Sequence, residues 1–260
     1  MNVVVCVKQI PDPAAPQSLD EHHRLNRGGK LILDEADTYG VEVALRLVEA
    51  AGDGEVLLVS MGEGSDVSGI RSALAMGAAR ATVVSDESLR GADALTTAKV
   101  LAAAVSRLAA DLVICATESS DGYTGTLPVQ LAQLLDLPAL TFATSVTVEG
   151  TTVVTHRQTE AGYDEVSAEL PALVTVTAGV VEPRYATFKG IMAAKSRPVD
   201  VLSVSDLGLA PASLDPRQDV VAVEAAAARS AGEKYVDEGD AAQRIVSYLE
   251  EIKVLSGGAS

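Results

Sequence analysis

The chain has little positive charge and few aromatic side chains. Its 260 residues include 20 basic and 36 acidic ones, for a formal net charge of −16. Nucleic acids and acidic membrane surfaces attract clustered basic residues, so this balance argues against either as a partner. Aromatic residues make up 3% of the chain, whereas apolar residues make up 48%. We therefore expect a core of small and branched aliphatic side chains, which suits a sheet covered by helices on both faces.

Cysteine and histidine are also scarce. Cys6 and Cys115 stand in separate apolar runs with no second cysteine or histidine nearby, which favours small buried side chains over zinc binding or redox pairing. His22 and His23 lie among charged residues in a polar loop, where solvent exposure is expected. No G-x-S-x-G motif marks a serine nucleophile. The sequence therefore predicts a binding protein with no catalytic residue and no metal site.

No apolar run is long and uncharged enough to cross a bilayer. The stretch from residue 92 to residue 116 comes nearest, but it contains Lys99, Arg107 and Asp111. A strand-like apolar run begins at residue 3, so no signal peptide is expected. These features predict a cytoplasmic protein without membrane insertion.

The first half of the chain alternates short apolar runs with helical periodicity. Runs typical of buried strands occupy residues 3–7, 56–59, 81–84 and 112–116. Helical patterns occupy residues 37–51, a segment that ends at Gly77, and residues 93–110 and 127–135. In the first of these, Val41, Leu45 and Val48 share one face, and Glu42 and Arg46 share the other. This alternation predicts an α/β fold with a doubly wound, Rossmann-like parallel sheet.

The pattern changes after residue 140. Residues 142–148, 153–158 and 163–170 are predicted to form an added antiparallel sheet, and residues 173–176 a further buried strand. Residues 200–235 have no periodicity, and Asp240 then begins an amphipathic helix. We predict an α/β domain over residues 1–199 and a C-terminal arm over residues 200–260. So long a tether favours an arm that packs on another chain, although an arm folded back on its own core is an alternative.

The loop over residues 117–126 is the first candidate site. It follows a buried strand and begins a helix, and ligands of open α/β sheets bind at this end of the strands. Glycines allow close backbone approach, hydroxyls can donate, and the helix N-terminus attracts a phosphate. A helix cap without a ligand is the alternative. The loop residues predicted to bind are Thr117, Ser119, Ser120, Asp121, Gly122, Thr124, Gly125 and Thr126.

The ends of the first two strands and the start of the first helix are expected to form the other walls of this crevice. The dinucleotide fingerprint G-x-G-x-x-G is incomplete, because Val67 stands where the third glycine belongs after Gly62 and Gly64. The P-loop motif is absent as well. The predicted wall residues are Cys6, Asp34, Glu35, Ala36, Asp37 and Met61.

Residues 184–197 form the second candidate site, because they carry four basic residues and no acidic one in an acidic chain. An apolar edge with a basic rim is typical of a transient docking surface. The alternative is that the apolar residues pack into the core while the charged groups reach solvent. The residues predicted to dock a partner are Arg184, Phe188, Lys189, Ile191, Met192, Lys195 and Arg197.

Together these segments resemble the electron-transfer flavoprotein β-subunit family. The resemblance covers nearly the whole chain, and residues 182–195 (EPRYATFKGIMAAK) are its most specific part. The other matching segments are residues 5–8 (VCVK), 72–78 (SALAMGA), 119–125 (SSDGYTG), 137–142 (LPALTF) and 231–234 (AGEK).

The resemblance implies a heterodimer with an α subunit that holds most of a redox-active FAD. The β subunit would contribute a wall of the flavin site and bind AMP in a structural role, at Cys6, residues 34–37, Met61 and residues 117–126. Residues 184–197 correspond to the loop that docks an acyl-CoA dehydrogenase in fatty acid oxidation, with Phe188 at its apolar anchor. Electrons would pass on to a quinone oxidoreductase or a similar acceptor.

The chain departs from some relatives in this pocket. Asp34 and Glu35 stand where those relatives have an Asn-Pro pair, and Asp34 would repel a phosphate at close range. Bifurcating relatives bind a second FAD here; AMP is expected because the dinucleotide fingerprint is incomplete. The alternative function is a stand-alone adenine-nucleotide-binding regulator of the universal-stress-protein type. That alternative explains the loop over residues 117–126, but it leaves residues 184–197 and the arm unexplained.

Overall fold

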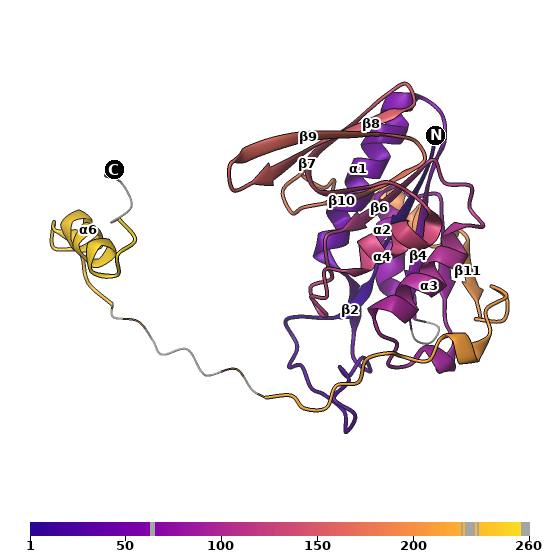
Figure 1. The fold of residues 1–260 in the computed structure, drawn as a ribbon, viewed down its shortest axis with the longest axis horizontal. Helices are drawn as coiled ribbons and strands as arrows, with labels where there is room; N and C mark the ends of the chain where they lie inside the picture. Colours follow the sequence, from indigo (N-terminus) through magenta and orange to yellow (C-terminus); the bar gives the residue numbers. More distant parts are fainter. Residues whose placement is uncertain (63–65, 225, 227–231, 233, 256–260) are drawn as a thin grey trace. The chain divides into compact units, whose positions relative to one another are not determined.

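The computed structural model describes the chain except for residues 63–65, 225, 227–231, 233 and 256–260 (Figure 1). Three predicted features fall partly outside the described residues: the incomplete fingerprint at Gly64, the matching segment at residues 231–234 and the C-terminal arm over residues 200–260. The chain divides into two units, Met1–Val221 and Ala222–Ser260.

A large mixed sheet forms the centre of the first unit. In the described part of the chain its order is β11-β5-β4-β1-β6-β10-β7-β8-β9, and the strands from β11 to β7 pair in parallel. The parallel strands are β1 (Asn2–Cys6), β4 (Glu55–Met61), β5 (Arg80–Val84), β6 (Leu112–Ala116), β7 (Ala139–Glu149), β10 (Ala172–Val176) and β11 (Val199–Leu202). A small separate sheet pairs β2 (Gln9–Pro11) with β3 (Leu31–Leu33) in antiparallel fashion.

The predicted antiparallel strands are present, but they extend the main sheet rather than form a sheet of their own. β8 (Thr152–Thr159) pairs with β7, and β9 (Gly162–Glu169) pairs with β8. Because β7 also pairs with β10, the antiparallel strands continue directly from the parallel core. β11 was not predicted. It pairs with β5 from Val199 opposite Ala81 to Leu202 opposite Val84, so the compact unit continues past residue 199.

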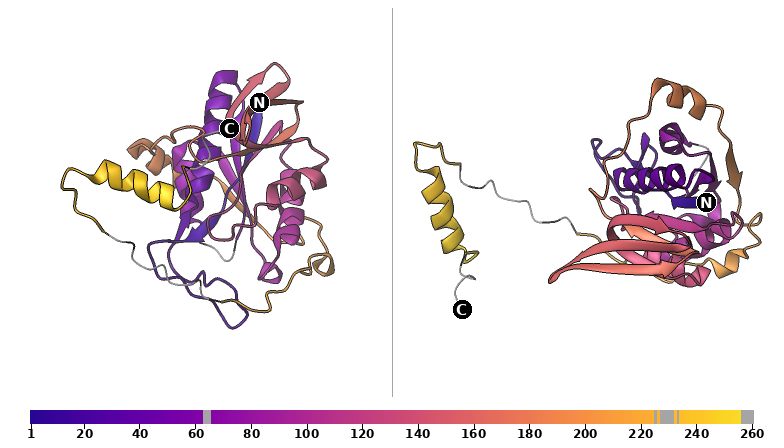
Figure 2. Two further views of the ribbon diagram at one scale, coloured as in Figure 1. Left: turned by 60° about the vertical axis from the view of Figure 1, so that its left-hand side comes forward. Right: turned by 90° about the horizontal axis from the view of Figure 1, so that it is seen from above.

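Helices cover both faces of the sheet (Figure 2). Val3 and Val5 of β1 belong to one buried cluster, while Val4 and Cys6 belong to the other, as expected for a strand covered on both sides. The doubly wound α/β fold is therefore confirmed. One cluster includes α1 (Glu35–Ala51) and α2 (Ser68–Met76), and the other includes α3 (Ala94–Val105) and α4 (Leu127–Leu135). The shorter elements are η1 (Glu87–Leu89), α5 (Phe188–Ala194) and η2 (Pro211–Ser213).

One helical prediction needs correction. The helix predicted over residues 93–110 ends at Val105, because the N–H groups of Arg107 and Leu108 bond three residues back instead of four. In α1, the expected pair forms between Glu42 and Arg46, with Arg46 Nε 2.6 Å from the carboxylate, but Glu42 is only 2% exposed. Its carboxylate lies inside because a distant arginine pairs with it, as described below.

The second unit contains α6 (Ala241–Glu251). Asp240 precedes the helix as predicted, but its carboxylate pairs with Arg244 at 2.7 Å instead of capping the backbone. No residue of this helix is buried, and Ile245 and Ile252 are exposed.

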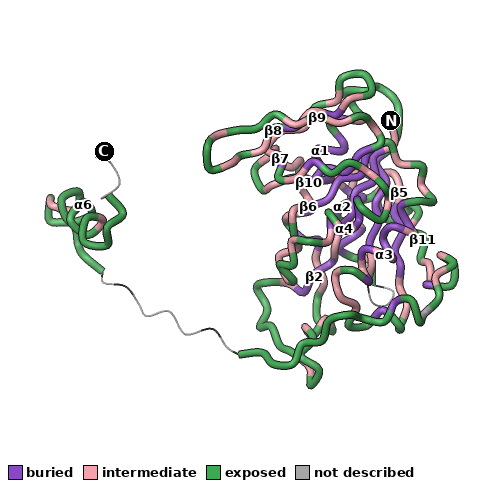
Figure 3. Tube along the Cα trace, in the orientation of Figure 1, coloured by how far each residue is buried: buried purple, intermediate pink, exposed green. Residues whose placement is uncertain are grey.

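Figure 3 shows that the buried residues lie mainly along the central strands of the sheet. Among the described residues, no helix combines the length and hydropathy that a bilayer crossing requires.

Candidate functional site

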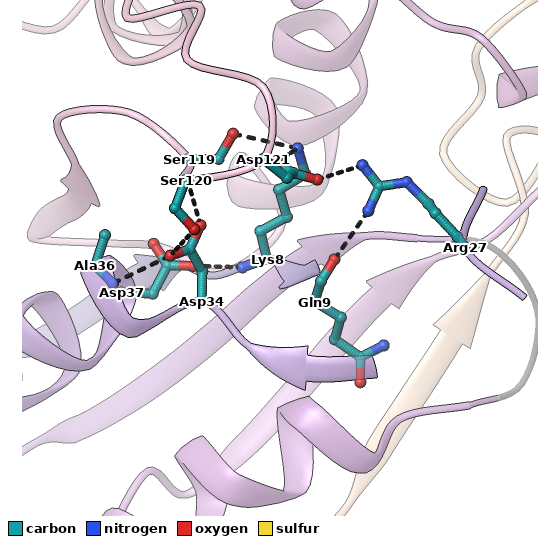
Figure 4. A network of polar contacts seen from close by, with 9 residues as sticks. All are labelled: Lys8, Gln9, Arg27, Asp34, Ala36, Asp37, Ser119, Ser120 and Asp121. Carbon is teal, nitrogen blue, oxygen red and sulfur yellow. Dashed lines mark hydrogen bonds and ion pairs between the residues drawn. The ribbon is translucent and has the colours of Figure 1, made fainter. Parts of the chain in front are cut away.

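The first candidate site lies where the strand order reverses. β4 and β5 follow β1 on one side, and the chain then returns to place β6 on the other side of β1. The carboxyl ends of β1 and β6 therefore flank the switch point, where open α/β sheets bind ligands. Figure 4 shows Lys8 after β1, Asp34 before α1 and the loop after β6 converging at this point.

Asp34 connects the start of α1 to the loop after β6. One carboxylate oxygen accepts from Ala36 N–H at 3.1 Å and from Ser120 Oγ at 2.9 Å. The other accepts from Ser120 N–H at 2.7 Å. Asp34 is fully buried, so its charge is held between two protein segments. The structure thus gives Asp34 the geometry of a loop anchor, with its hydrogen bonds directed to protein donors.

Asp121 forms the centre of a second contact group. Lys8 Nζ lies 2.6 Å from one of its carboxylate oxygens, and Arg27 pairs with the other. Lys8 Nζ also donates to Ser119 Oγ at 3.2 Å. Burial alone would raise the pKa of Asp121, but the two cations outweigh it and hold the pKa below its usual range. Arg27 was missed in the sequence, because nothing there separates it from Arg24 in the same polar loop.

Asp37 is buried beneath these groups. Its carboxylate accepts from Lys8 N–H at 2.6 Å. Burial raises the pKa of Asp37 well above its usual value; the Lys8 hydrogen bond opposes this effect, and the negative charge of Asp34 adds to it. The folded protein therefore binds a proton at Asp37 more tightly than the unfolded chain does.

Cys6 and Cys115 lie on the neighbouring strands β1 and β6, and both are buried. A hydrogen bond with Cys6, together with burial, raises the pKa of the Cys115 thiol well above its usual value. The Cys115 thiol therefore lacks the lowered pKa that marks a reactive cysteine. As a separate finding, the described residues contain no cluster of His, Cys, Asp and Glu suited to a metal ion.

The rest of the loop after β6 presents backbone groups at the start of α4. Tyr123 and Gly125 adopt left-handed conformations, with φ of 48° and 62°. Gly122 and Thr124 are exposed, and the side chain of Thr126 makes no capping bond to α4. No side-chain cap therefore occupies the start of this helix, although Pro128 in its first turn has no N–H to donate. An open hollow of about 290 Å³ borders Ser120 and Asp121.

The remaining predicted wall residues are more widely spread. Cys6 and Met61 lie at the carboxyl ends of β1 and β4, and Thr117 Oγ1 donates to the Val176 carbonyl at 3.1 Å. Glu35 is exposed and Ala36 is half-buried at the start of α1. The structure therefore joins Asp34, Asp37 and residues 119–121 through direct contacts, while Met61 and Glu35 lie outside that network.

The second candidate site contains the short helix α5. Thr187 caps it by accepting from Gly190 N–H at 3.0 Å. Phe188 is 80% exposed, and Ile191 and Met192 are about half exposed. The alternative in which these three side chains pack into the core is wrong.

The predicted basic rim of α5 is smaller than expected. Arg184 pairs with Glu42 and Glu49 of α1. Arg197 donates to the Leu74 and Ala78 carbonyls at the end of α2. These two guanidinium groups anchor the segment, so its exposed cationic side chains are Lys189 and Lys195.

Comparison with known proteins identifies the family. The family model described as electron transfer flavoprotein domain matches residues 24–207. The electron transfer flavoprotein subunit beta of Mycobacterium tuberculosis (strain ATCC 25618 / H37Rv) is 35% identical over 264 residues, covering 98% of this chain and 99% of the relative. Its counterpart in Mycobacterium leprae (strain TN) is 36% identical with the same coverage. The caffeyl-CoA reductase-Etf complex subunit CarD of Acetobacterium woodii is 33% identical over 81% of each chain.

These matches bear on the two functions that the sequence left open. The two mycobacterial relatives are named as electron transfer flavoprotein subunits, which are electron carriers rather than catalysts, and the third as a subunit of a reductase-Etf complex; none of the three carries the name of a stand-alone regulator. A subunit named beta implies a partner subunit, and a flavoprotein implies a flavin in the complex. The match over most of the chain, together with relatives that align almost end to end, shows that this chain belongs to the electron transfer flavoprotein β-subunit family.

Proposed function

We propose that this chain binds AMP in a structural role beside β1 and β6, and docks acyl-CoA-type dehydrogenases through α5. The observation that carries the first part is the anchored loop after β6. Asp34 accepts two hydrogen bonds from Ser120, and the exposed residues Gly122 and Thr124 follow in the same loop, shortly before α4. A phosphate group suits such a helix N-terminus.

The residues around this loop suit the binding of an adenylate better than they suit catalysis by the chain itself. Lys8 and Arg27 neutralise Asp121, and Asp34 is satisfied by protein donors, so the buried carboxylates are accounted for within the chain. Met61 offers partly exposed apolar surface at the end of β4, while Cys6 is buried at the end of β1. FAD, held mainly by the α subunit, supplies the redox chemistry, and this chain supplies scaffold and docking surface.

The docking proposal rests on apolar side chains that the fold leaves half or largely exposed. Phe188, Ile191 and Met192 lie along one side of α5, with Lys189 and Lys195 beside them. A large aromatic anchor with a charged rim suits a transient electron-transfer encounter. Electrons would then pass to a quinone oxidoreductase or a similar acceptor, and the dehydrogenases would be those of fatty acid oxidation.

The C-terminal unit is proposed to pack on the α subunit. α6 carries Ile245, Leu249 and Ile252 on one face, and no residue of the helix is buried. An amphipathic helix with an uncovered apolar face gains stability by packing against another surface.

Replacing Phe188 by alanine tests the docking role. We expect the KM of an acyl-CoA dehydrogenase for the heterodimer to rise at least about tenfold, because a central aromatic anchor carries much of a transient interface. Dehydrogenase-linked dye reduction measures the rate, and absorbance measures the flavin content, which should not change. Val201→Ala on β11, also an exposed apolar side chain, is the matched control. Equal KM values for Phe188→Ala and the wild type would refute the docking surface.

A further inference from the structure

We propose that Arg184 is a positioning residue, which fixes the orientation of the docking helix α5 by binding two glutamates of α1. This inference rests on the proposed docking function of α5. The apolar face of α5 is not fully packed against the core, because Phe188 is 80% exposed and Ile191 and Met192 are about half exposed. The orientation of that face therefore depends largely on the anchors on either side of it.

Arg184 provides the anchor before α5. Its Nε lies 2.7 Å and its backbone N–H 3.1 Å from one carboxylate oxygen of Glu42. Its terminal nitrogens bind both carboxylate oxygens of Glu49, at 2.6 Å and 3.0 Å. Such a two-pronged contact fixes direction as well as distance. Glu42 also accepts from Arg46 Nε at 2.6 Å, so the buried carboxylate has two cationic partners.

Two other arginines, Arg71 and Arg197, provide the anchor after α5. Arg71 Nη1 donates to the carbonyls of Ala194 at 2.7 Å and Arg197 at 2.6 Å. Arg197 in turn donates to the Leu74 carbonyl at 2.9 Å. The end of α5 is therefore fixed to α2 by hydrogen bonds in both directions.

The middle of α5 also lies close to α2. A Cβ atom added to Gly190 would lie 2.4 Å from the Ala75 carbonyl oxygen, so only glycine permits this approach. A helix of seven residues is too short to be stable alone, and its position depends on such contacts. With the middle and the end held by α2, Arg184 fixes the start of the segment, four residues before Phe188.

Loss of the Arg184 anchor is expected to weaken docking without affecting electron transfer after docking. A mobile recognition segment loses more conformational entropy on binding than a fixed one. In the heterodimer carrying Arg184→Gln, we expect the KM for an acyl-CoA dehydrogenase to rise about three- to tenfold, with kcat unchanged. The KM of Arg184→Lys should fall between those of the wild type and Arg184→Gln, because an ammonium cannot bind two carboxylates as a planar guanidinium does.

Amide hydrogen exchange of the same heterodimers measures the position of α5 directly. Peptides covering residues 188–194 should exchange faster in Arg184→Gln than in the wild type, with flavin content unchanged. Arg107→Gln is the matched control, because Arg107 also ties a helix end to a distant segment by donating to the Asp206 carbonyl at 2.6 Å. That control should leave both KM and exchange of α5 as in the wild type.

The double variant Glu42→Gln/Arg184→Gln separates positioning from stability, because it removes the buried carboxylate charge together with one of the two cations that neutralise it. We expect its thermal stability to return towards the wild type while its KM stays raised. If Phe188→Ala raises the KM but Arg184→Gln leaves KM and exchange unchanged, the positioning role is refuted and the docking surface stands. If Phe188→Ala leaves the KM unchanged, the docking surface is refuted and the role of Arg184 with it.

Discussion

Replacing Asp34 by alanine is expected to release the adenylate from the heterodimer and to lower the free energy of unfolding by about 2–4 kcal/mol. The buried carboxylate accepts three hydrogen bonds, one from Ala36 and two from Ser120. Alanine leaves these donors without a partner in a site that water reaches poorly. The loop after β6 then loses its tie to α1, and with it the geometry that presents Gly122 and Thr124.

Denaturant unfolding and nucleotide analysis of the purified heterodimer measure the two effects. Asp86→Ala is the matched control, because Asp86 also holds two segments, through Ser88 N–H at 3.0 Å and Val204 N–H at 3.1 Å. We expect Asp86→Ala to reduce stability but to leave the adenylate in place. Adenylate retained at wild-type content in Asp34→Ala would contradict the anchoring role of Asp34.

Replacing Asp37 by asparagine is expected to stabilise the protein at neutral pH. Burial raises the pKa of Asp37 in the folded state above its unfolded value, so the folded protein binds the proton more tightly. Stability is therefore lost as the pH rises from the usual carboxyl range through the raised pKa. Asparagine removes this loss, and its side-chain oxygen can still accept from Lys8 N–H, as Asp37 does at 2.6 Å.

Thermal unfolding over a range of pH tests this prediction. The melting temperature of Asp37→Asn should exceed that of the wild type at neutral pH, by about 2–4 °C for each kcal/mol gained, and the difference should shrink at acidic pH. Asp121→Asn is the matched control with the opposite sign. Its cationic partners lower the pKa of Asp121, so Asp121 stabilises the fold above the usual carboxyl range and its loss should destabilise. A melting temperature for Asp37→Asn below that of the wild type at neutral pH would contradict the account.

The sequence predicts the parallel core well, because burial on both faces leaves a strong local signal. The run at residues 112–116 and the helical pattern at residues 127–135 coincide with β6 and α4. β11 escapes this reasoning because it is a four-residue edge strand with Asp200 exposed in its middle. An edge strand needs only one neighbour, so its sequence carries little periodicity.

Contacts between distant residues explain most of what the sequence missed. Glu42 is buried because Arg184, which lies 142 positions further along the chain, pairs with it. Arg27 reaches Asp121 across 94 positions, and no local pattern distinguishes it. The loop after β6 was found because its glycines and hydroxyls lie directly after a strand. The contacts of that loop with other segments, such as the hydrogen bond from Ser120 to Asp34, depend on the folded geometry.

Nucleotide analysis of the denatured heterodimer tests the central claim most directly. The claim is that the backbone at the start of α4 binds an adenylate, while another polypeptide holds the redox-active flavin. Chromatography of the released nucleotides should give AMP and FAD in equal amounts. Release of flavin without AMP, and without a second flavin to take its place, would contradict the claim.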